Sequence, residues 1–333
     1  MTGKMKVGSG VDNRPMVSVV MITYNQERYV EKAIRGVLRQ KGGYGLQLVI
    51  CDDASTDGTP AIAEKWQREY PDIIDFHRNP HNIGLARNYV QALSLCRGKY
   101  VAMCDGDDYW CSRSKLKLQV GYMENHPDCA LTYHRVINYY QGTGEKHLSN
   151  GGGASSQSVT AGQLAKRNSI TNLSVMYRAE LVDLKKLPEW LAEIRLVDYC
   201  LHLLYASKGG VHYFSKPMGV YRKAGEGVWT HAESVQRLRM AFDVRVKMIR
   251  ELQQYPEIVA AIRESCVDHI VSMLAEGERG LAEHSLHLIG AGSSITVESL
   301  EERVSARRRA IAGKKNIPAR IAGFLSRLLP LPS

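Results

Sequence analysis

The chain is 333 residues long, with 44% hydrophobic and 23% charged residues. This composition excludes a disordered or fibrous protein and predicts a globular chain with one large or two ordinary domains. The net charge is +10, but eight Lys or Arg residues and no acidic residue lie between positions 303 and 333. The excess charge therefore belongs mainly to the C-terminal end, and charge alone selects neither nucleic acid nor lipid headgroups as its partner.

The cysteines and the N-terminal residues indicate the cellular compartment of the protein. The seven cysteines include no Cys-x-x-Cys pair and lie mostly in apolar strings such as Val49–Cys51. They are typical of small buried hydrophobic residues in a reducing compartment. Residues 1–15 are polar and have no apolar core, so they predict neither a signal peptide nor a membrane span. We expect a flexible arm there, in a cytoplasmic protein.

Strand-like and helix-like segments alternate over the first third of the chain. Short apolar runs rich in β-branched residues predict buried strands at 17–23, 46–51, 73–77 and 99–103. Helical spacing, with a proline opening the second helix, predicts helices at 29–38, 60–70 and 85–95. This alternation predicts an α/β fold with a parallel sheet and right-handed crossovers.

The pattern is mixed after residue 110 and helical after about residue 232. Apolar spacing predicts helices at 113–124 and 197–206 and strands at 129–140, 172–177, 211–214 and 218–221. A loop rich in glycine and serine is predicted at 142–158. We therefore expect a domain over 16–232, with halves 16–110 and 111–232, and a helical C-terminal region over 233–333. That region could close over a site or mediate oligomerisation, but packing on the sheet is its expected role.

An acidic cluster directly follows the predicted strand at 99–103. It reads Cys104-Asp105-Gly106-Asp107-Asp108-Tyr109-Trp110. Three carboxylates at the end of a buried strand repel one another, which favours a cation among them. A plain turn is the alternative, because aspartate is common where strands end. Polar loops also follow the first two strands, and carboxyl ends of parallel strands meet at one edge of a sheet, so the three loops are expected to converge.

Several enzyme classes are disfavoured by absent motifs. The loop after the first strand has neither the Gly-x-Gly-x-x-Gly pattern of dinucleotide-binding proteins nor the Gly-x-x-x-x-Gly-Lys-Ser/Thr pattern of P-loop proteins. No His-Glu-x-x-His or Gly-x-Ser-x-Gly motif occurs. The remaining interpretation is a nucleotide held by carboxylates and a tyrosine, with a divalent ion.

Four segments carry a resemblance to a known family. They are VSVVMITYNQERY (17–29), CDDASTDGT (51–59), NIGLARN (82–88) and YVAMCDGDDYW (100–110). Their order resembles that of the family-two glycosyltransferases, inverting enzymes with the GT-A fold. Residues 196–201, 209–211, 220–222 and 227–229 resemble the acceptor half of members that build bacterial polysaccharides. The resemblance implies a GT-A domain with a Rossmann-like, mostly parallel sheet, and it covers residues 16–231.

The resemblance implies roles for the donor side of the site. Tyr24 would stack on a nucleobase, and Asp53 would accept a hydrogen bond from its imide, which suits a UDP-sugar donor. Thr23 and Asp52 lie in the same two loops and join this group. Further donor-binding positions, for which a helix cap or a turn is the alternative, are Asn25 and Glu27.

The same resemblance assigns the diphosphate and its ion. Arg87 would pair with a phosphate, or alternatively with the acidic cluster. Asp105 and Gly106 would contact the donor, and Asp107, together with Asp105, would bind Mn²⁺ or Mg²⁺. Asp108 either joins them or braces the loop.

The acceptor side is expected to supply the base. Asp198 matches the general base of the family, and its place at a helix start predicts that the helix dipole keeps it ionised. The alternative is that Asp198 only caps the helix. Arg222, Lys223, Trp229 and His231 are expected on the acceptor or diphosphate side. Related chains often carry Tyr-Arg-x-His, and this chain has Ala224 at the histidine position. His231 or water would then complete the coordination shell of the metal ion, or Arg222 and Lys223 would neutralise the diphosphate directly.

The basic C-terminal end predicts contact with a membrane surface. Ile321, Phe324, Leu325 and Leu328 share one helical face beside Arg320 and Arg327, as in an interfacial helix on an anionic leaflet. We thus expect a glycosyltransferase at the inner face of the membrane, acting on a saccharide carried by a polyprenyl lipid. The alternatives are a non-catalytic nucleotide-binding member, suggested by Ala224, and a basic nucleic-acid-binding protein.

Overall fold

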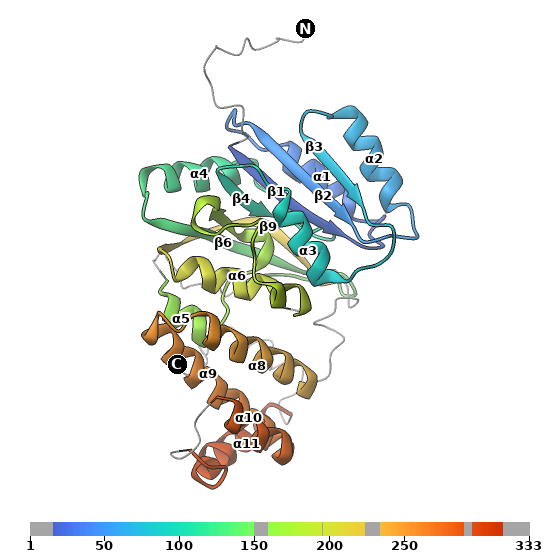
Figure 1. The fold of residues 1–333 in the computed structure, drawn as a ribbon. Coiled ribbons are helices and arrows are strands. Elements are labelled where there is room, and N and C mark those ends of the chain that lie inside the picture. The colour runs from blue at the N-terminus through green and yellow to red at the C-terminus, as the bar shows by residue number, and fades with distance from the viewer. Residues whose placement is uncertain (1–15, 150–158, 195, 224–233, 290–294, 316–333) are drawn as a thin grey trace. The chain divides into compact units, whose positions relative to one another are not determined.

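The computed structural model describes residues 16–149, 159–194, 196–223, 234–289 and 295–315 (Figure 1). The chain divides into two compact units, residues 1–231 and 232–333.

Strands and helices alternate at the start of the first unit. The strands are β1 (Val17–Thr23), β2 (Leu46–Asp52), β3 (Ile74–Arg78) and β4 (Tyr100–Met103). The helices between them are α1 (Val30–Leu38), α2 (Thr59–Glu69) and α3 (Leu85–Ser94). The four strands pair in parallel in the order β3-β2-β1-β4. The predicted alternation and parallel sheet are confirmed.

The sheet continues in mixed orientation after β4. Its further strands are β5 (Tyr109–Trp110), β6 (Cys129–Tyr140), β7 (Lys146–Leu148), β8 (Met176–Arg178) and β9 (Gly210–Lys223). β8 runs antiparallel to β4 and β6, whereas β9 runs parallel to β6 and antiparallel to β5. The helices of this part are α4 (Lys115–Asn125), α5 (Ala161–Lys166) and α6 (Val197–Ala206).

Three predictions in this part were wrong. The sequence predicts a strand over 172–177, but Asn172–Ser174 form a 3-10 helix and β8 begins at Met176. The two strands predicted at 211–214 and 218–221 are one strand, because the pairing of β9 with β6 shifts register between His134 and Val136 and so passes Pro217 without a break. The loop predicted at 142–158 contains β7, which pairs with β6, while residues 150–158 lie outside the described ranges.

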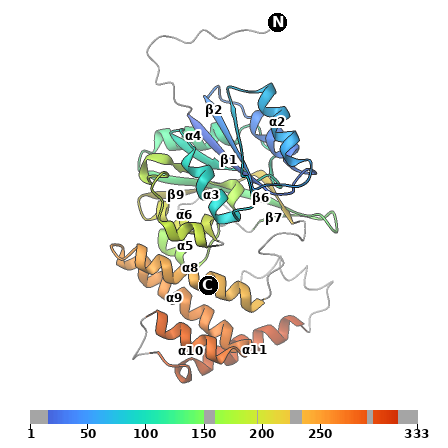
Figure 2. The same cartoon turned by 45° about the vertical axis from the view of Figure 1, so that its right-hand side comes forward.

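Helices cover both faces of the parallel strands. Val17, Val19 and Met21 of β1 share one buried cluster with Ala33 and Ile34 of α1. Because side chains alternate between the faces of a strand, the other face of β1 is left for α3, which packs on β1 and β2. Figures 1 and 2 show α3 and α6 on the same side of the sheet. Burial on both faces explains why these strands read as continuous apolar runs.

The register of the sheet brings the predicted loops to one edge. Thr23 at the end of β1 pairs with Asp52 at the end of β2, and Val20 pairs with Met103 at the end of β4. The Gly106 amide then donates to the Ile22 carbonyl over 3.1 Å. β1 lies between β2 and β4, because the chain adds β2 and β3 on one side of β1 and then adds β4 on the other side. Open α/β sheets bind ligands at the point where the strand order reverses in this way.

The second unit is helical in its described residues. Its helices are α8 (Ser234–Glu251), α9 (Pro256–Ala275), α10 (Arg279–Leu288) and α11 (Glu301–Lys315). Its buried side chains include Phe242, Met248, Ile262 and Ile270. Within the described ranges, no helix combines the length and the apolar character needed to cross a bilayer.

All seven cysteines are free thiols, and five of them are buried, as their apolar surroundings predict.

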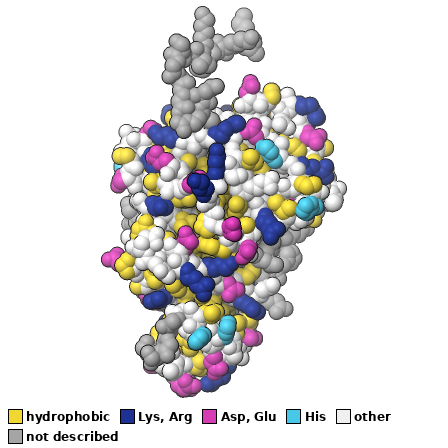
Figure 3. Space-filling model, in the orientation of Figure 1, with side chains coloured by type: hydrophobic (Ala, Val, Ile, Leu, Met, Phe, Trp, Pro, Cys, Tyr) yellow, Lys and Arg dark blue, Asp and Glu magenta, His cyan; other side chains and the backbone are white. Residues whose placement is uncertain are grey.

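On the face in Figure 3, acidic side chains are interspersed among the Lys and Arg side chains. The described residues on that face therefore form no unbroken basic surface of the kind that binds a nucleic-acid backbone.

Candidate functional site

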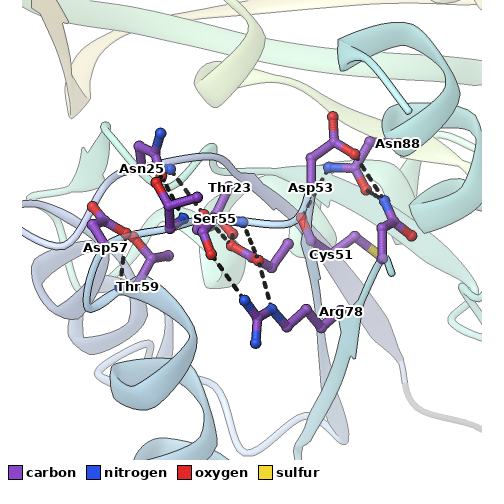
Figure 4. A network of polar contacts seen from close by, with 12 residues as sticks. Thr23, Asn25, Cys51, Asp53, Ser55, Asp57, Thr59, Arg78 and Asn88 are labelled. Carbon is purple, nitrogen blue, oxygen red and sulfur yellow. Dashed lines mark hydrogen bonds and ion pairs between the residues drawn. The ribbon is translucent and has the colours of Figure 1, made fainter. Parts of the chain in front are cut away.

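Asp52 organises the loop that follows β2. Its side chain is fully buried and accepts hydrogen bonds from the Thr23 hydroxyl over 3.0 Å and from the Ser55 amide over 2.9 Å. The Arg78 guanidinium lies 3.7 Å from the same carboxylate and donates to the Ser55 carbonyl over 2.9 Å (Figure 4). The side chains of Thr23 and Asp52 thus bond to each other and to the loop after β2, and they support the site by holding that loop.

Asp53 connects the same loop to the start of α3. Its backbone amide donates to the Thr23 carbonyl, and its carboxylate accepts from Asn79 and from the amides of Ile83 and Gly84 over 2.8–3.0 Å. Among the described residues, the Oδ2 atom accepts only the Gly84 amide, which leaves it a lone pair for another donor. Asp53 is therefore both fixed in orientation and able to accept one further hydrogen bond.

Asn25 and Glu27 join the loops after β1 and β2. Asn25 has a positive φ of 51°, and its side chain accepts from the Thr56 amide over 2.9 Å (Figure 4). Glu27 accepts from the Gly58 amide over 2.8 Å, at the start of α2. Glu27 therefore holds the residue that precedes α2, and Asn25 holds the two loops together.

Tyr24 and Arg87 face solvent beside these loops. The Tyr24 side chain is 48% exposed, and Arg87 is also exposed. Among the described residues, Arg87 makes no ion pair with the acidic cluster, so that alternative for Arg87 finds no support. Both side chains are free to meet a ligand that approaches this edge of the sheet.

The acidic cluster presents a buried oxygen atom without a partner. Asp105 Oδ2 accepts from the Asn172 side-chain amide over 2.9 Å. Asp105 Oδ1 is buried, and so is the nearby Gln26 Oε1, yet neither has a hydrogen-bond partner within the described part of the chain. Other described side chains, such as Tyr213, also have buried polar atoms without partners, but here two such oxygen atoms lie beside carboxylates, which suits a ligand, an ion or water.

Asp107 and Asp108 have different surroundings. Asp108 is 3% exposed and accepts from the Arg222 amide over 2.8 Å, so it braces the cluster against β9. Arg222 Nε donates to the Asp107 carbonyl over 2.8 Å, and its guanidinium lies over the Tyr29 ring at 4.4 Å. The Asp107 carboxylate is left partly exposed beside the guanidinium.

The carboxylates of the site influence one another electrostatically. Burial, with the charge of Asp107, raises the pKa of Asp105 to about 7, and the charge of Asp198 adds to this rise. Burial raises the pKa of Asp107, and the nearby Arg222 partly offsets that effect. Because the charge of Asp107 raises the pKa of Asp105, the two carboxyl groups are suited to share a cation, which would remove this repulsion.

Asp198 lies in the first turn of α6, and its charge raises the pKa of Asp105 in this cluster. Among the predicted acceptor-side residues that the structure describes, it is the one with this effect on Asp105. Burial raises its pKa, although the backbone amides of Tyr199 and of Asp198 itself favour the ionised form. Desolvation of the carboxylate thus acts against the helix start, which favours the ionised form. A carboxylate with a raised pKa is a stronger base.

Gly106 is required by the close approach of the acidic cluster to β1. A Cβ atom at this position would lie 2.6 Å from Thr23 Cγ2 and would also overlap Gln26 Oε1. We expect Gly106→Ala to lower the free energy of unfolding by about 1–3 kcal/mol, because the added methyl must displace the loop. Urea unfolding measures this change.

Gly121→Ala is the matched control, since Gly121 lies in α4 with no atom within 4 Å of its Cβ position. Removing a helical glycine is expected to stabilise the protein by about 0.5–1 kcal/mol. A Gly106→Ala protein as stable as the unaltered one would contradict the role of this contact.

Some predicted residues lie outside the described residues, and others were missed. Trp229, His231 and Ala224 belong to the first group. Lys223, at the end of β9, is described, and it donates to the Tyr140 hydroxyl over 3.2 Å. Asn172 was missed because the sequence predicts a strand there. Tyr89, whose hydroxyl donates to Asn172, was missed as well. Its position directly after the NIGLARN segment was the only feature of the sequence that could have indicated a role for it.

Comparison with known proteins identifies the family. Residues 18–180 match the model for glycosyl transferase family 2. The chain is 34% identical over 222 residues to an uncharacterized protein of Mycobacterium tuberculosis, and this match covers 66% of the chain and 62% of that relative. It is 32% identical over 117 residues to the abequosyltransferase RfbV of Salmonella typhimurium, with 35% of each chain covered. The first unit therefore belongs to glycosyltransferase family 2.

Solved structures with the same fold agree with this assignment. TarS of S. aureus, solved as residues 1–349 with UDP-GlcNAc, has a TM-score of 0.59 and 19% identity, with 87% of this chain and 83% of that chain covered. The mannosyltransferase PcManGT of Pyrobaculum calidifontis, solved with GDP-Man and Mn²⁺, has a TM-score of 0.56 and 20% identity, with 89% and 81% covered. At this identity the likeness establishes the fold, which is the GT-A fold.

Proposed function

We propose that this protein is a metal-dependent, inverting glycosyltransferase that moves a sugar from a nucleoside diphosphate, UDP in the first instance, to a saccharide in polysaccharide synthesis. The observation that carries the proposal is the buried Oδ1 of Asp105, which has no partner among the described residues and lies within electrostatic reach of Asp198. One carboxyl group serves the donor and the other serves the acceptor, as an inverting transfer requires.

The loops after β1 and β2 would hold the nucleoside. Tyr24 is exposed and can stack on the base. Asp53 is fixed by three protein donors, and its Oδ2 retains a lone pair for the imide of uracil. Arg87 is exposed at the start of α3 and can pair with a phosphate. Asn25, Glu27, Thr23 and Asp52 keep these loops in place.

Asp105 and Asp107 would hold the divalent ion. The described residues contain no group of three or more His, Cys, Asp and Glu side chains that could bind a metal by themselves. Mg²⁺ and related ions are commonly held by one or two carboxylates together with substrate phosphates, so the two aspartates fit a site completed by the diphosphate. When bound, the ion offsets charge on the departing diphosphate. Arg222 lies beside Asp107 and can assist in this neutralisation.

Asp198 would remove the proton from the attacking acceptor hydroxyl. Its raised pKa increases its basicity, and its position in α6 places it on a different element from the donor carboxylates. The oxygen freed of its proton attacks the anomeric carbon on the face opposite the diphosphate, the bond to the diphosphate breaks, and the configuration inverts. Lys223, Trp229 and His231 belong to the acceptor side in this scheme.

A screen of nucleotide sugars tests the proposal. We expect UDP-sugars, with Mn²⁺ present, to raise the melting temperature of the protein, because a ligand that binds only the folded state stabilises it. EDTA should abolish most of this increase. Absence of stabilisation and of donor hydrolysis with UDP- and GDP-sugars alike would reject the proposal.

We also propose that the C-terminal end contacts an anionic membrane surface. In α11, Arg307 and Arg309 are exposed and have no ion pair among the described residues, while Arg303 pairs with Asp268. The apolar face predicted at 321–328 lies outside the described residues. A polyprenyl-linked acceptor would be reached at such a surface.

Charge reversal in α11 tests the membrane contact. We expect Arg307→Glu combined with Arg309→Glu to weaken binding to vesicles of phosphatidylglycerol at least about 25-fold, since each basic residue near an anionic surface contributes about 1 kcal/mol. Cosedimentation measures binding, with Arg263→Glu, at an exposed position of α9, as the control. Equal sedimentation of all three proteins would show that α11 does not contact the membrane.

A further inference from the structure

Asp105 is held by a side chain from the other half of the domain. The Asn172 amide nitrogen donates to Asp105 Oδ2 over 2.9 Å, and this bond joins the loop after β4 to the 3-10 helix Asn172–Ser174. The neighbouring Leu173 carbonyl accepts from the Trp110 indole over 2.9 Å, so the 3-10 helix is attached to both ends of the acidic cluster. Oδ2 is thereby fixed, and Oδ1 is the oxygen that has no partner in the described part of the chain.

Asn172 is in turn held by Tyr89 of α3. The Tyr89 hydroxyl donates to Asn172 Oδ1 over 2.9 Å, and the Tyr89 side chain is 3% exposed. An asparagine amide has a donor end and an acceptor end that differ little in shape. The Tyr89 hydroxyl donates to the acceptor end, and the donor end faces Asp105. Rotation of the amide would place two oxygen atoms, Asn172 Oδ1 and Asp105 Oδ2, against each other.

The same helix also supports the nucleoside loop. The amides of Ile83 and Gly84, directly before α3, donate to Asp53, and Tyr89 lies one turn further along. One rigid element therefore fixes both the carboxylate proposed for the base and the carboxylate proposed for the ion. Burial raises the pKa of the Tyr89 hydroxyl, and the charges of Asp105 and Asp198 contribute, so this hydroxyl remains a donor.

We propose that Asn172 and Tyr89 are positioning residues that aim Asp105 Oδ1 at the divalent ion. This inference rests on the proposed function, since it takes Asp105 as a ligand of that ion. Neither residue touches the ion or the donor. Their effect is to hold one rotamer of Asp105, so that the carboxylate does not have to be ordered when the ion binds. Partners that orient metal ligands in this way typically contribute 10- to 100-fold to metal affinity.

Binding of Mn²⁺ to the full-length protein tests the inference without measuring catalysis. The probe is Mn²⁺ alone, and the electron paramagnetic resonance signal of the free ion gives its dissociation constant. We expect Asn172→Ala to raise this constant about 10- to 100-fold and Tyr89→Phe to raise it about 10-fold. Tyr213→Phe is the matched control, because the Tyr213 hydroxyl is buried and has no partner within the described residues.

The outcomes separate this inference from the proposed function. If Asp107→Asn loses Mn²⁺ binding while Asn172→Ala and Tyr89→Phe bind like the unaltered protein, the positioning role is wrong and the metal site stands. If the unaltered protein binds Mn²⁺ only when UDP is present, the variants are compared with UDP present. If it binds no Mn²⁺ even then, the metal site and the positioning role both fall. Melting temperatures identify a structural defect: Tyr89→Phe with a lower melting temperature and unchanged Mn²⁺ affinity would also overturn the positioning role.

Discussion

Asp198→Asn is expected to abolish sugar transfer while leaving nucleotide binding intact. The amide has the shape of the carboxylate but cannot take a proton, so we expect kcat to fall about 10²–10⁴-fold, the range that a general base contributes. Asp198 belongs to α6, whereas the loops proposed to bind the nucleotide follow β1, β2 and β4. The dissociation constant for UDP with Mn²⁺ should therefore change little.

The measurement is the rate of transfer from the donor that the nucleotide-sugar screen identifies, together with calorimetric binding of UDP. Asp183→Asn is the control, because Asp183 is an exposed aspartate of the same half of the domain. Transfer by Asp198→Asn at the unaltered rate would remove Asp198 from its role. Loss of UDP binding would instead indicate that the substitution disturbs the donor side.

Asp107→Asn is expected to remove the metal-dependent part of donor binding and turnover. The amide keeps the volume but loses the charge that holds the ion, and a cost of about 3 kcal/mol corresponds to roughly 100-fold in rate. EDTA should lower the activity of the unaltered protein by a similar factor and should have little further effect on the variant. Activity at a series of Mn²⁺ concentrations measures both.

Asp72→Asn provides the comparison for this prediction. Asp72 is an exposed aspartate just before β3, at the opposite end of the strands from the acidic cluster. It should retain the activity and the Mn²⁺ dependence of the unaltered protein. If Asp107→Asn behaves in the same way as Asp72→Asn, then Asp107 is not a ligand of the ion.

The strands and helices of the first third were predictable, because a strand that is buried on both faces needs an unbroken run of apolar residues. β1, β2 and β4 read as apolar runs, and the helices between them show regular apolar spacing. The second half was less predictable. β8 has three residues and β5 has two, and segments this short carry no periodic signal. Their positions follow from pairing with distant strands.

The roles of individual polar residues were less predictable than their locations. Asp52 and Asp53 are adjacent and chemically identical, yet Asp52 is enclosed by Thr23, Ser55 and Arg78, while Asp53 reaches toward α3. Adjacent residues of a strand end point in different directions, so distant partners decide which carboxylate is available to a ligand. The sequence contains both residues but not the partners that distinguish them.

The sequence by itself determined the family, the sheet that begins the fold and the three polar loops that meet at its edge. These properties are local, because they depend on apolar periodicity and on short ordered motifs. The tertiary structure alone decided that one oxygen of Asp105 has no partner among the described residues, that Asn172 and Tyr89 hold the other, and that burial raises the pKa of Asp198. Hydrogen-bond geometry and desolvation depend on residues that lie 67 and 83 positions apart in the chain and come together only when it folds.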